Sequence, residues 1–407
     1  MDSKYKFLTL KYALINASFM FMICATVGYG YNFLSQSGFA DGTVGIIITA
    51  VSICGLIGQT LSGSVIDKSQ KLDEKKFLSF AMVCVVALAV LLALMPEGSI
   101  GMIVMTLLCF TSASIGMPIL NSLAFVYEND GQKINYGLCR GIGSAAWAIG
   151  SSLIGQLWGM MGRKILPWYV VAFAVVSFLL VQWMPSPSRE ASDVIENDPG
   201  EGKPAKGLSY VAFFKKYKKI IPVLAALVLL YFCHMMINTY MAKIVGNMLG
   251  SAAGTPGAVE SVQGNFLFIA AMVELPTMFL FSKIIEKISI QKVMVIASVI
   301  WSIKHALTWL CPNVYIFYGI AVLQMFAYAA MAPAIVYFAN QSVEELDRNK
   351  SQAVFAASNT VGNLLSSLVG GQLFQFMNVP NVIMIGVIAS IIGTILMAIG
   401  IKTQKAV

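Results

Sequence analysis

Twelve apolar runs, each long enough to cross a lipid bilayer, follow one another along this 407-residue chain. About 20 apolar residues, at a rise of roughly 1.5 Å each, span the hydrocarbon core of a membrane. The composition agrees, because 58% of the residues are hydrophobic and only 11% are charged. The runs cover about 8–34, 43–62, 77–95, 100–127, 136–160, 165–184, 219–246, 260–282, 291–311, 314–340, 351–376 and 380–401. The sequence therefore predicts an all-α membrane protein with twelve transmembrane helices.

Lysine and arginine residues predict the orientation of these helices. With the N-terminus inside, 22 of the basic residues fall in cytoplasmic segments and two, Arg163 and Lys164, in external loops. An excess of basic residues marks the cytoplasmic side. We expect a multi-pass protein of the cell (inner, cytoplasmic) membrane with both termini in the cytoplasm. This topology explains the net charge of +8, which gives no indication of nucleic-acid binding.

The chain is predicted to consist of two similar halves. A proline-rich polar stretch separates the sixth run from the seventh, and several short segments recur after it. The recurring pairs are Pro118 and Pro333, 151–155 and 366–370, and 156–157 and 372–373 at an offset of about 215, and 63–68 and 282–287 at an offset near 219. Two facing bundles around a midplane site are typical of alternating access. We predict six-helix bundles over 1–184 and 219–407 and a cytoplasmic linker over 185–218.

Arg140 stands out because it lies inside a membrane-length apolar run. A charge at the centre of a membrane helix costs about 2.5–3.5 kcal/mol on insertion scales, so it normally faces a polar cavity or a partner. Arg140, Ser144 and Trp147 are spaced i, i+4, i+7 and share one helix face. A guanidinium, a hydroxyl and an indole together indicate a binding site for a polar ligand.

Glu274 is the second charge deep in a run, and Lys304 with His305 lies in the next one. Opposite charges at such depth are expected to pair. We therefore expect Glu274 to lie within reach of Lys304 or Arg140.

Further polar residues interrupt the apolar runs and are candidates for the same site. They are Tyr29, Tyr31 and Asn32 in the first run, His234, Asn238 and Tyr240 in the seventh, and Asn359 and Asn363 in the eleventh. His234 and Asn238 are one turn apart and share a face. For all of these residues, hydrogen bonding between helices is the alternative to ligand contact.

Two motifs resemble those of known transporters. Gly45-Ile46-Ile47-Ile48 through Gln59-Thr60-Leu61-Ser62-Gly63-Ser64-Val65-Ile66-Asp67-Lys68 resembles the signature of helix two and loop 2–3 in the major facilitator superfamily. Tyr136-Gly137…Arg140…Gly143-Ser144…Trp147 resembles the helix-five motif of the lactose permease-like oligosaccharide:proton symporters. The resemblance implies the fold of that superfamily, two pseudo-symmetric six-helix bundles, and a monomer.

The resemblance also implies roles for single residues. In lactose permease-like proteins the arginine matching Arg140 hydrogen-bonds sugar hydroxyls, and the tryptophan matching Trp147 stacks on the pyranose ring. Glu274 matches a sugar-binding glutamate, and Lys304 and His305 fall near that family's proton site. The superfamily signature carries a conformational latch over to Gly63, Asp67 and Lys68.

The chain departs from this family at three positions, two in helix ten and one in helix four. Gln324 and Ala327 stand where helix ten of the family has a histidine and a proton-carrying glutamate, and Asn121 aligns with a sugar-binding glutamate of helix four. Proton coupling is therefore assigned to Glu274, with His305 or His234. A uniporter is one alternative. Sodium coupling is another, although the sequence has no cluster of several carboxylates that would favour it.

The favoured function is secondary transport of a small sugar-like solute, an oligosaccharide or glycoside, with a proton as the coupling ion. A nucleoside, an aromatic carboxylate and a non-transporting membrane receptor are the alternatives. No catalytic motif is present: the sequence has no phosphate-binding glycine loop and no HExxH, so an enzyme is not expected. The seven cysteines lie in apolar stretches without metal-ligand spacing, so neither a metal nor a cofactor is expected.

Overall fold

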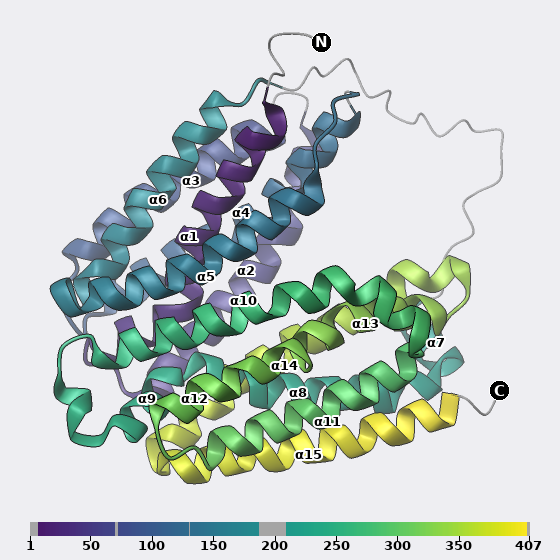
Figure 1. Ribbon diagram of the computed structural model, residues 1–407. Coiled ribbons are helices and arrows are strands. Elements are labelled where there is room, and N and C mark those ends of the chain that lie inside the picture. The colour runs from purple at the N-terminus through teal and green to yellow at the C-terminus, as the bar shows by residue number, and fades with distance from the viewer. Residues whose placement is uncertain (1–6, 70–71, 130, 187–208, 405–407) are drawn as a thin grey trace. The chain divides into compact units, whose positions relative to one another are not determined.

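The computed structural model describes residues 7–69, 72–129, 131–186 and 209–404, and these residues form helices and no strand (Figure 1). The α-helices are α1 (Leu8–Ser35), α2 (Asp41–Lys68), α3 (Glu74–Leu94), α4 (Ile100–Asn129), α5 (Tyr136–Met161), α6 (Ile165–Trp183), α7 (Tyr210–Lys216), α8 (Ile221–Thr239), α9 (Met241–Leu249), α10 (Ala258–Lys287), α11 (Ile290–Trp309), α12 (Val314–Ala321), α13 (Tyr328–Gln341), α14 (Arg348–Phe376) and α15 (Val379–Gln404). The predicted all-α fold is confirmed, and every predicted run holds at least one helix.

Two of the predicted runs are interrupted. Run 219–246 forms α8 and α9, and run 314–340 forms α12 and α13 with the 3₁₀ turn Val322–Met325 between them. Ten stretches of the described chain can cross a membrane by length and composition, and one of them, Tyr136–Trp183, contains both α5 and α6. α14 is not among the ten, because polar residues recur along its length and lower its hydropathy. When α5 and α6 are counted separately and α14 is added, the helices are compatible with the twelve predicted membrane-crossing segments.

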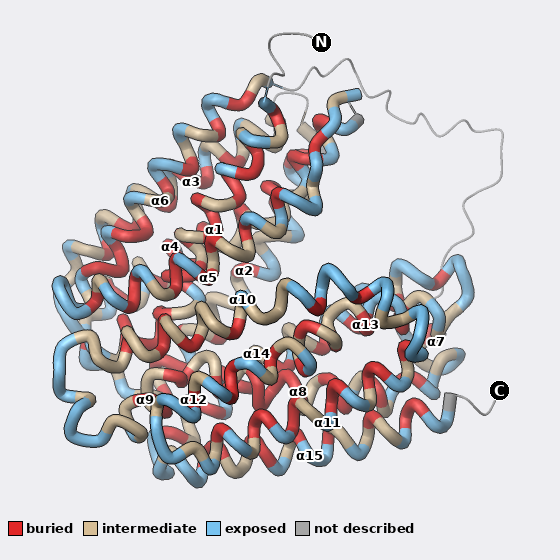
Figure 2. Tube along the Cα trace, viewed as in Figure 1, coloured by how far each residue is buried: buried red, intermediate tan, exposed pale blue. Residues whose placement is uncertain are grey.

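The outer faces of the helices are apolar. Phe80, Leu179, Phe279 and Ile395 are each more than half exposed, and exposed stretches run along most helices (Figure 2). Apolar surface of this extent is unusual on a soluble monomer. It suits helices that are surrounded by lipid, since every backbone polar group is bonded within the helix.

The described residues form two compact units. The first consists of the described residues within Met1–Arg189, Thr239–Ala271 and Ser367–Phe376, and the second of those within Glu190–Asn238, Met272–Ser366 and Met377–Val407. Thus α10 and α14 each contribute to both units. The predicted bundles, 1–184 and 219–407, divide the sequence at other points and stay a prediction. Most of the predicted linker, 185–218, lies outside the described residues.

In the first unit, α1 packs against α5 and α6, α3 packs against α4 and α6, and α2 packs against α4. α1 is buried along most of its length (Figure 2). Glycines let the helices approach closely: a Cβ at Gly150 of α5 would lie 2.8 Å from the Phe21 ring and 2.9 Å from Cys24 Sγ of α1.

At two further helix crossings in the first unit, a glycine allows one helix to approach the backbone of the other. Where α5 meets α10, a Cβ on Gly264 would lie 2.5 Å from the carbonyl oxygen of Ser151. The Tyr29 hydroxyl donates to that same oxygen at 2.6 Å. Where α2 meets α14, a Cβ on Gly371 would lie 2.7 Å from the carbonyl oxygen of Asp41.

Gly264→Ala is expected to destabilise the protein by about 1–3 kcal/mol, because the added methyl group meets backbone that cannot move alone. Thermal unfolding of the detergent-solubilised protein measures the loss. Gly246→Ala is the matched control: nothing lies within 4 Å of a Cβ there, so alanine should leave the stability unchanged or raise it by up to about 1 kcal/mol through its higher helix propensity. Equal midpoints for both variants would contradict the close crossing.

In the second unit, α11 packs against α12, α13 and α15, and buried side chains that include Leu227, Trp301 and Phe338 form the core. The short helix α7 joins this unit through polar contacts. The Tyr217 hydroxyl donates to Asp347 Oδ2 at 2.9 Å, and Lys216 Nζ lies 2.7 Å from Glu344 Oε2. The hydrogen bond to Glu344 raises the pKa of the Lys216 ammonium, which favours the charged pair.

Candidate functional site

The predicted face of α5 exists, since α5 is continuous from Tyr136 to Met161. Arg140 is exposed, and among the described residues its guanidinium makes no hydrogen bond or ion pair. The Ser144 hydroxyl donates to the Arg140 carbonyl oxygen at 3.3 Å, and Trp147 is half-buried. The Arg140 side chain is therefore accessible and Trp147 is partly accessible, and both residues belong to the first unit.

Two other candidates in the first unit are more enclosed. Tyr29 is fully buried, and its hydroxyl is bonded to the Ser151 carbonyl oxygen at 2.6 Å. This contact ties α1 to α5, so ligand contact by Tyr29 stays a prediction. Asn121 of α4 is half-buried, and its Oδ1 is a buried atom without a partner among the described groups.

In the second unit, Gln324 connects the two deep charges. Its Nε2 donates to Glu274 Oε1 at 2.8 Å, and its Oε1 accepts a hydrogen bond from Lys304 Nζ. Gln324 and Lys304 are buried, with exposed fractions of 5% and 3%, and Glu274 is half-buried. The expected proximity of Glu274 to Lys304 is thus met through a bridging amide.

The interruption between α12 and α13 explains how Gln324 takes this position. Gln324 lies in the 3₁₀ turn Val322–Met325, so it is not held to the register of a continuous helix. An amide has two donors and one acceptor oxygen, which lets one side chain bond a carboxylate and an ammonium together. The result is a polar chain that runs from α10 to α11 within the second unit.

The two histidines lie close to this chain in the same unit. Asn238 Nδ2 lies 3.1 Å from His234 Nε2, which confirms their shared face. The His234 ring also stacks on Tyr328 at 5.5 Å between ring centroids. His305 is fully buried, with its Nδ1 2.8 Å from Ser390 Oγ and its Nε2 unpaired within the described structure. A role of His305 in proton exchange stays a prediction.

The remaining candidates are less informative. Asn359 of α14 is half-buried, and Gly63 of α2 has open space around the position of a Cβ. The side chains of Asp67 and Lys68 lie outside the described residues, so the predicted latch stays a prediction.

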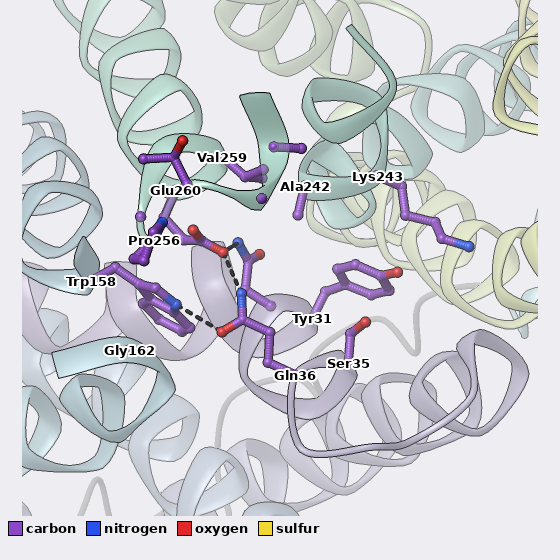
Figure 3. A pocket seen from close by; sticks show the side chains of 15 residues that line it. Tyr31, Ser35, Gln36, Trp158, Gly162, Ala242, Lys243, Pro256, Val259 and Glu260 are labelled. Atoms are coloured by element: carbon purple, nitrogen blue, oxygen red, sulfur yellow. Dashed lines mark hydrogen bonds between the residues drawn. The ribbon is translucent and has the colours of Figure 1, made fainter. Parts of the chain in front are cut away.

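Sequence reasoning missed a polar cavity in the first unit. It has a volume of about 430 Å³ and is lined by residues that include Tyr31, Asn32, Gln36, Trp158, Lys243 and Glu260 (Figure 3). Lys243 of α9 forms an ion pair with Asp41 of α2, and Glu260 is buried with 3% of its surface exposed. Gln36 links Glu260 to Trp158, because its Nε2 donates to Glu260 Oε1 at 2.7 Å and its Oε1 accepts from Trp158 Nε1 at 2.9 Å.

The model of the MFS_1 like family matches residues 14–383, which is most of the chain. The chain belongs to the MFS_1 like family. This MFS_1 like protein is 23% identical over 366 residues to the "Uncharacterized transporter YwbF" of Bacillus subtilis (strain 168), a match covering 89% of this chain and 85% of that protein.

Solved structures share the fold of this MFS_1 like protein. A mutant of the nucleoside transporter NupG superposes with a TM-score of 0.78 at 15% identity and covers 97% of this chain and 99% of its own. A bacterial homolog of the human lysosomal transporter Spinster superposes with a TM-score of 0.73 at 13% identity, covering 100% and 98%. The chain is a multi-pass membrane transporter of the major facilitator superfamily.

Proposed function

We propose that this transporter moves a small, neutral, polar solute, an oligosaccharide or glycoside, by alternating access. The observation that carries the proposal is the exposed guanidinium of Arg140, which makes no hydrogen bond or ion pair with another described group and shares a face with Ser144 and Trp147. Guanidinium offers five N–H donors in a fixed fork. An indole offers a flat apolar surface for the C–H face of a sugar ring. The resemblance of the α5 motif to lactose permease-like proteins supports the same assignment.

Proton coupling is the second part of the proposal. Glu274 is held by the neutral amide of Gln324 at 2.8 Å, and Lys304 reaches the same amide. A carboxylate at membrane depth is usually functional, and it can change its protonation state while the amide keeps it in place. His305 is the proposed partner in proton exchange.

Location and latch complete the proposal. We place the transporter in the cell membrane as a monomer with both termini in the cytoplasm, following the distribution of basic residues. Gly63, Asp67 and Lys68 are proposed to act in conformational change and not in solute binding.

Counterflow in proteoliposomes tests the substrate class. The protein is offered labelled glycosides, nucleosides and aromatic acids, and we expect saturable exchange of a glycoside. Trp147→Ala should abolish most of this exchange, whereas Trp168→Ala, which removes an exposed tryptophan of α6, should not. Exchange of nucleosides alone would replace the sugar by a nucleoside. Exchange of none of these solutes would contradict the sugar assignment.

A further inference from the structure

Two acidic residues occupy related positions in the repeated halves. Asp41 begins α2 and Glu260 lies in the first turn of α10, about 219 positions apart, the offset that relates 63–68 to 282–287. Both belong to the first unit. Each lies at a helix crossing where a glycine allows the two backbones to approach and a tyrosine hydroxyl donates to the facing backbone. Tyr29 donates to the carbonyl oxygen of Ser151 and Tyr240 to that of Ser367, both at 2.6 Å.

The chain itself supplies the cation at Asp41. Lys243 Nζ forms an ion pair with Asp41 Oδ2, and the Tyr31 hydroxyl donates to Asp41 Oδ1 at 2.6 Å. Lys243 follows Tyr240 by three positions in the sequence. One negative charge is therefore balanced by one positive charge.

At Glu260, the amide side chain of Asn32 takes the place that the ammonium of Lys243 has at Asp41. Asn32 follows Tyr29 by three positions, as Lys243 follows Tyr240. Asn32 Nδ2 donates to Glu260 Oε1 at 3.1 Å, and Gln36 Nε2 donates to it at 2.7 Å. Within the described ranges Glu260 forms no ion pair, although only 3% of its surface is exposed. A buried carboxylate without a counter-charge is unfavourable by several kcal/mol.

A second observation at the same place points to a ligand. Asn32 lines the cavity of about 430 Å³, has 2% of its surface exposed, and its Oδ1 has no hydrogen-bond partner among the described residues. Its Nδ2 is fixed by a further hydrogen bond to Gln263 Oε1 at 2.9 Å. Flipping the amide would lose these bonds, so the free atom is an oxygen, which seeks a donor or a cation.

We propose that the cavity binds a monovalent inorganic cation, sodium or potassium, through the Glu260 carboxylate and Asn32 Oδ1. Oxygen ligands suit hard cations, and a single carboxylate balances a single positive charge. The bound ion would balance the negative charge of Glu260, as the Lys243 ammonium balances that of Asp41. Lys243, the other charged residue lining the cavity, is committed to Asp41 and extends away from Glu260 in Figure 3.

Thermal unfolding of the purified protein tests this proposal without any transport measurement. The unfolding midpoint is measured in NaCl, KCl and N-methylglucamine chloride at one ionic strength and one pH. We expect a saturable rise of about 2 °C or more in sodium or potassium, because an ion that binds only the folded state stabilises it. The result does not depend on which solute is transported.

Three variants sharpen the test. Glu260→Gln should lose the response to the ion, since it removes the charge. Asn32→Lys should also lose it, because the lysine supplies the cation as Lys243 does, and this variant should be as stable without the ion as the wild type is with it. Glu286→Gln removes an exposed carboxylate near the other end of α10; it is the matched control and should keep the response.

Equal midpoints of the wild type in all three salts would overturn the proposal. A response that persists in Glu260→Gln or in Asn32→Lys would do so as well. If the unfolding midpoint changes with pH but not with sodium or potassium, the group that balances Glu260 is a proton and the proposal is wrong.

Discussion

Glu274→Gln is expected to abolish uphill accumulation of the solute while counterflow continues. Glutamine keeps the shape of the side chain but cannot release or bind a proton near neutral pH. The accumulation ratio should fall to about one, because a proton gradient drives transport only through a group that binds the proton. Uptake into proteoliposomes under an imposed pH gradient measures this ratio.

The matched control for this experiment is Glu286→Gln, which changes an exposed carboxylate near the end of the same helix, α10. It should accumulate solute as the wild type does. Undiminished uphill uptake by Glu274→Gln would exclude Glu274 as the proton carrier.

Arg140→Ala is expected to raise the half-saturating solute concentration about 10–100-fold, since a hydrogen bond from a charged donor contributes about 1.5–3 kcal/mol. Arg140→Lys should lie between, because lysine keeps the charge but lacks the planar fork. Counterflow at graded solute concentrations measures the change.

Arg348→Ala provides the control for Arg140, because Arg348 is exposed on α14 and pairs only with Glu345 among the described residues. Its half-saturating concentration should equal that of the wild type. An unchanged value in Arg140→Ala would remove Arg140 from the binding site.

Hydropathy predicted where the helices lie but not where they break. The runs are long and apolar, so their positions follow from composition alone. Tyr240 and the turn Val322–Met325 interrupt helices at places where the sequence has no proline. Tertiary contacts, such as the hydrogen bond from Tyr240 to Ser367 O, favour these breaks, and no local pattern reports them.

The deep charges were predictable because each lies in the middle of an apolar run, far from the charged residues at the ends of that run, as Glu274 and Lys304 do. Gln324 was noticed only as a departure from a family, and its bridging role needs the fold. Asp41 and Glu260 gave no signal, since acidic residues are ordinary in the first turn of a helix. The repeat offset near 219 relates these two residues, so it could have predicted that they lie in similar surroundings.

Proton movement during solute transport tests the central claim most directly. A saturating pulse of the exchanged glycoside is added to de-energised proteoliposomes, and the external pH is recorded. The account predicts that the medium becomes more alkaline as solute and protons enter together, and that Glu274→Gln shows no such change. Solute entry at the wild-type rate with a constant external pH would contradict it.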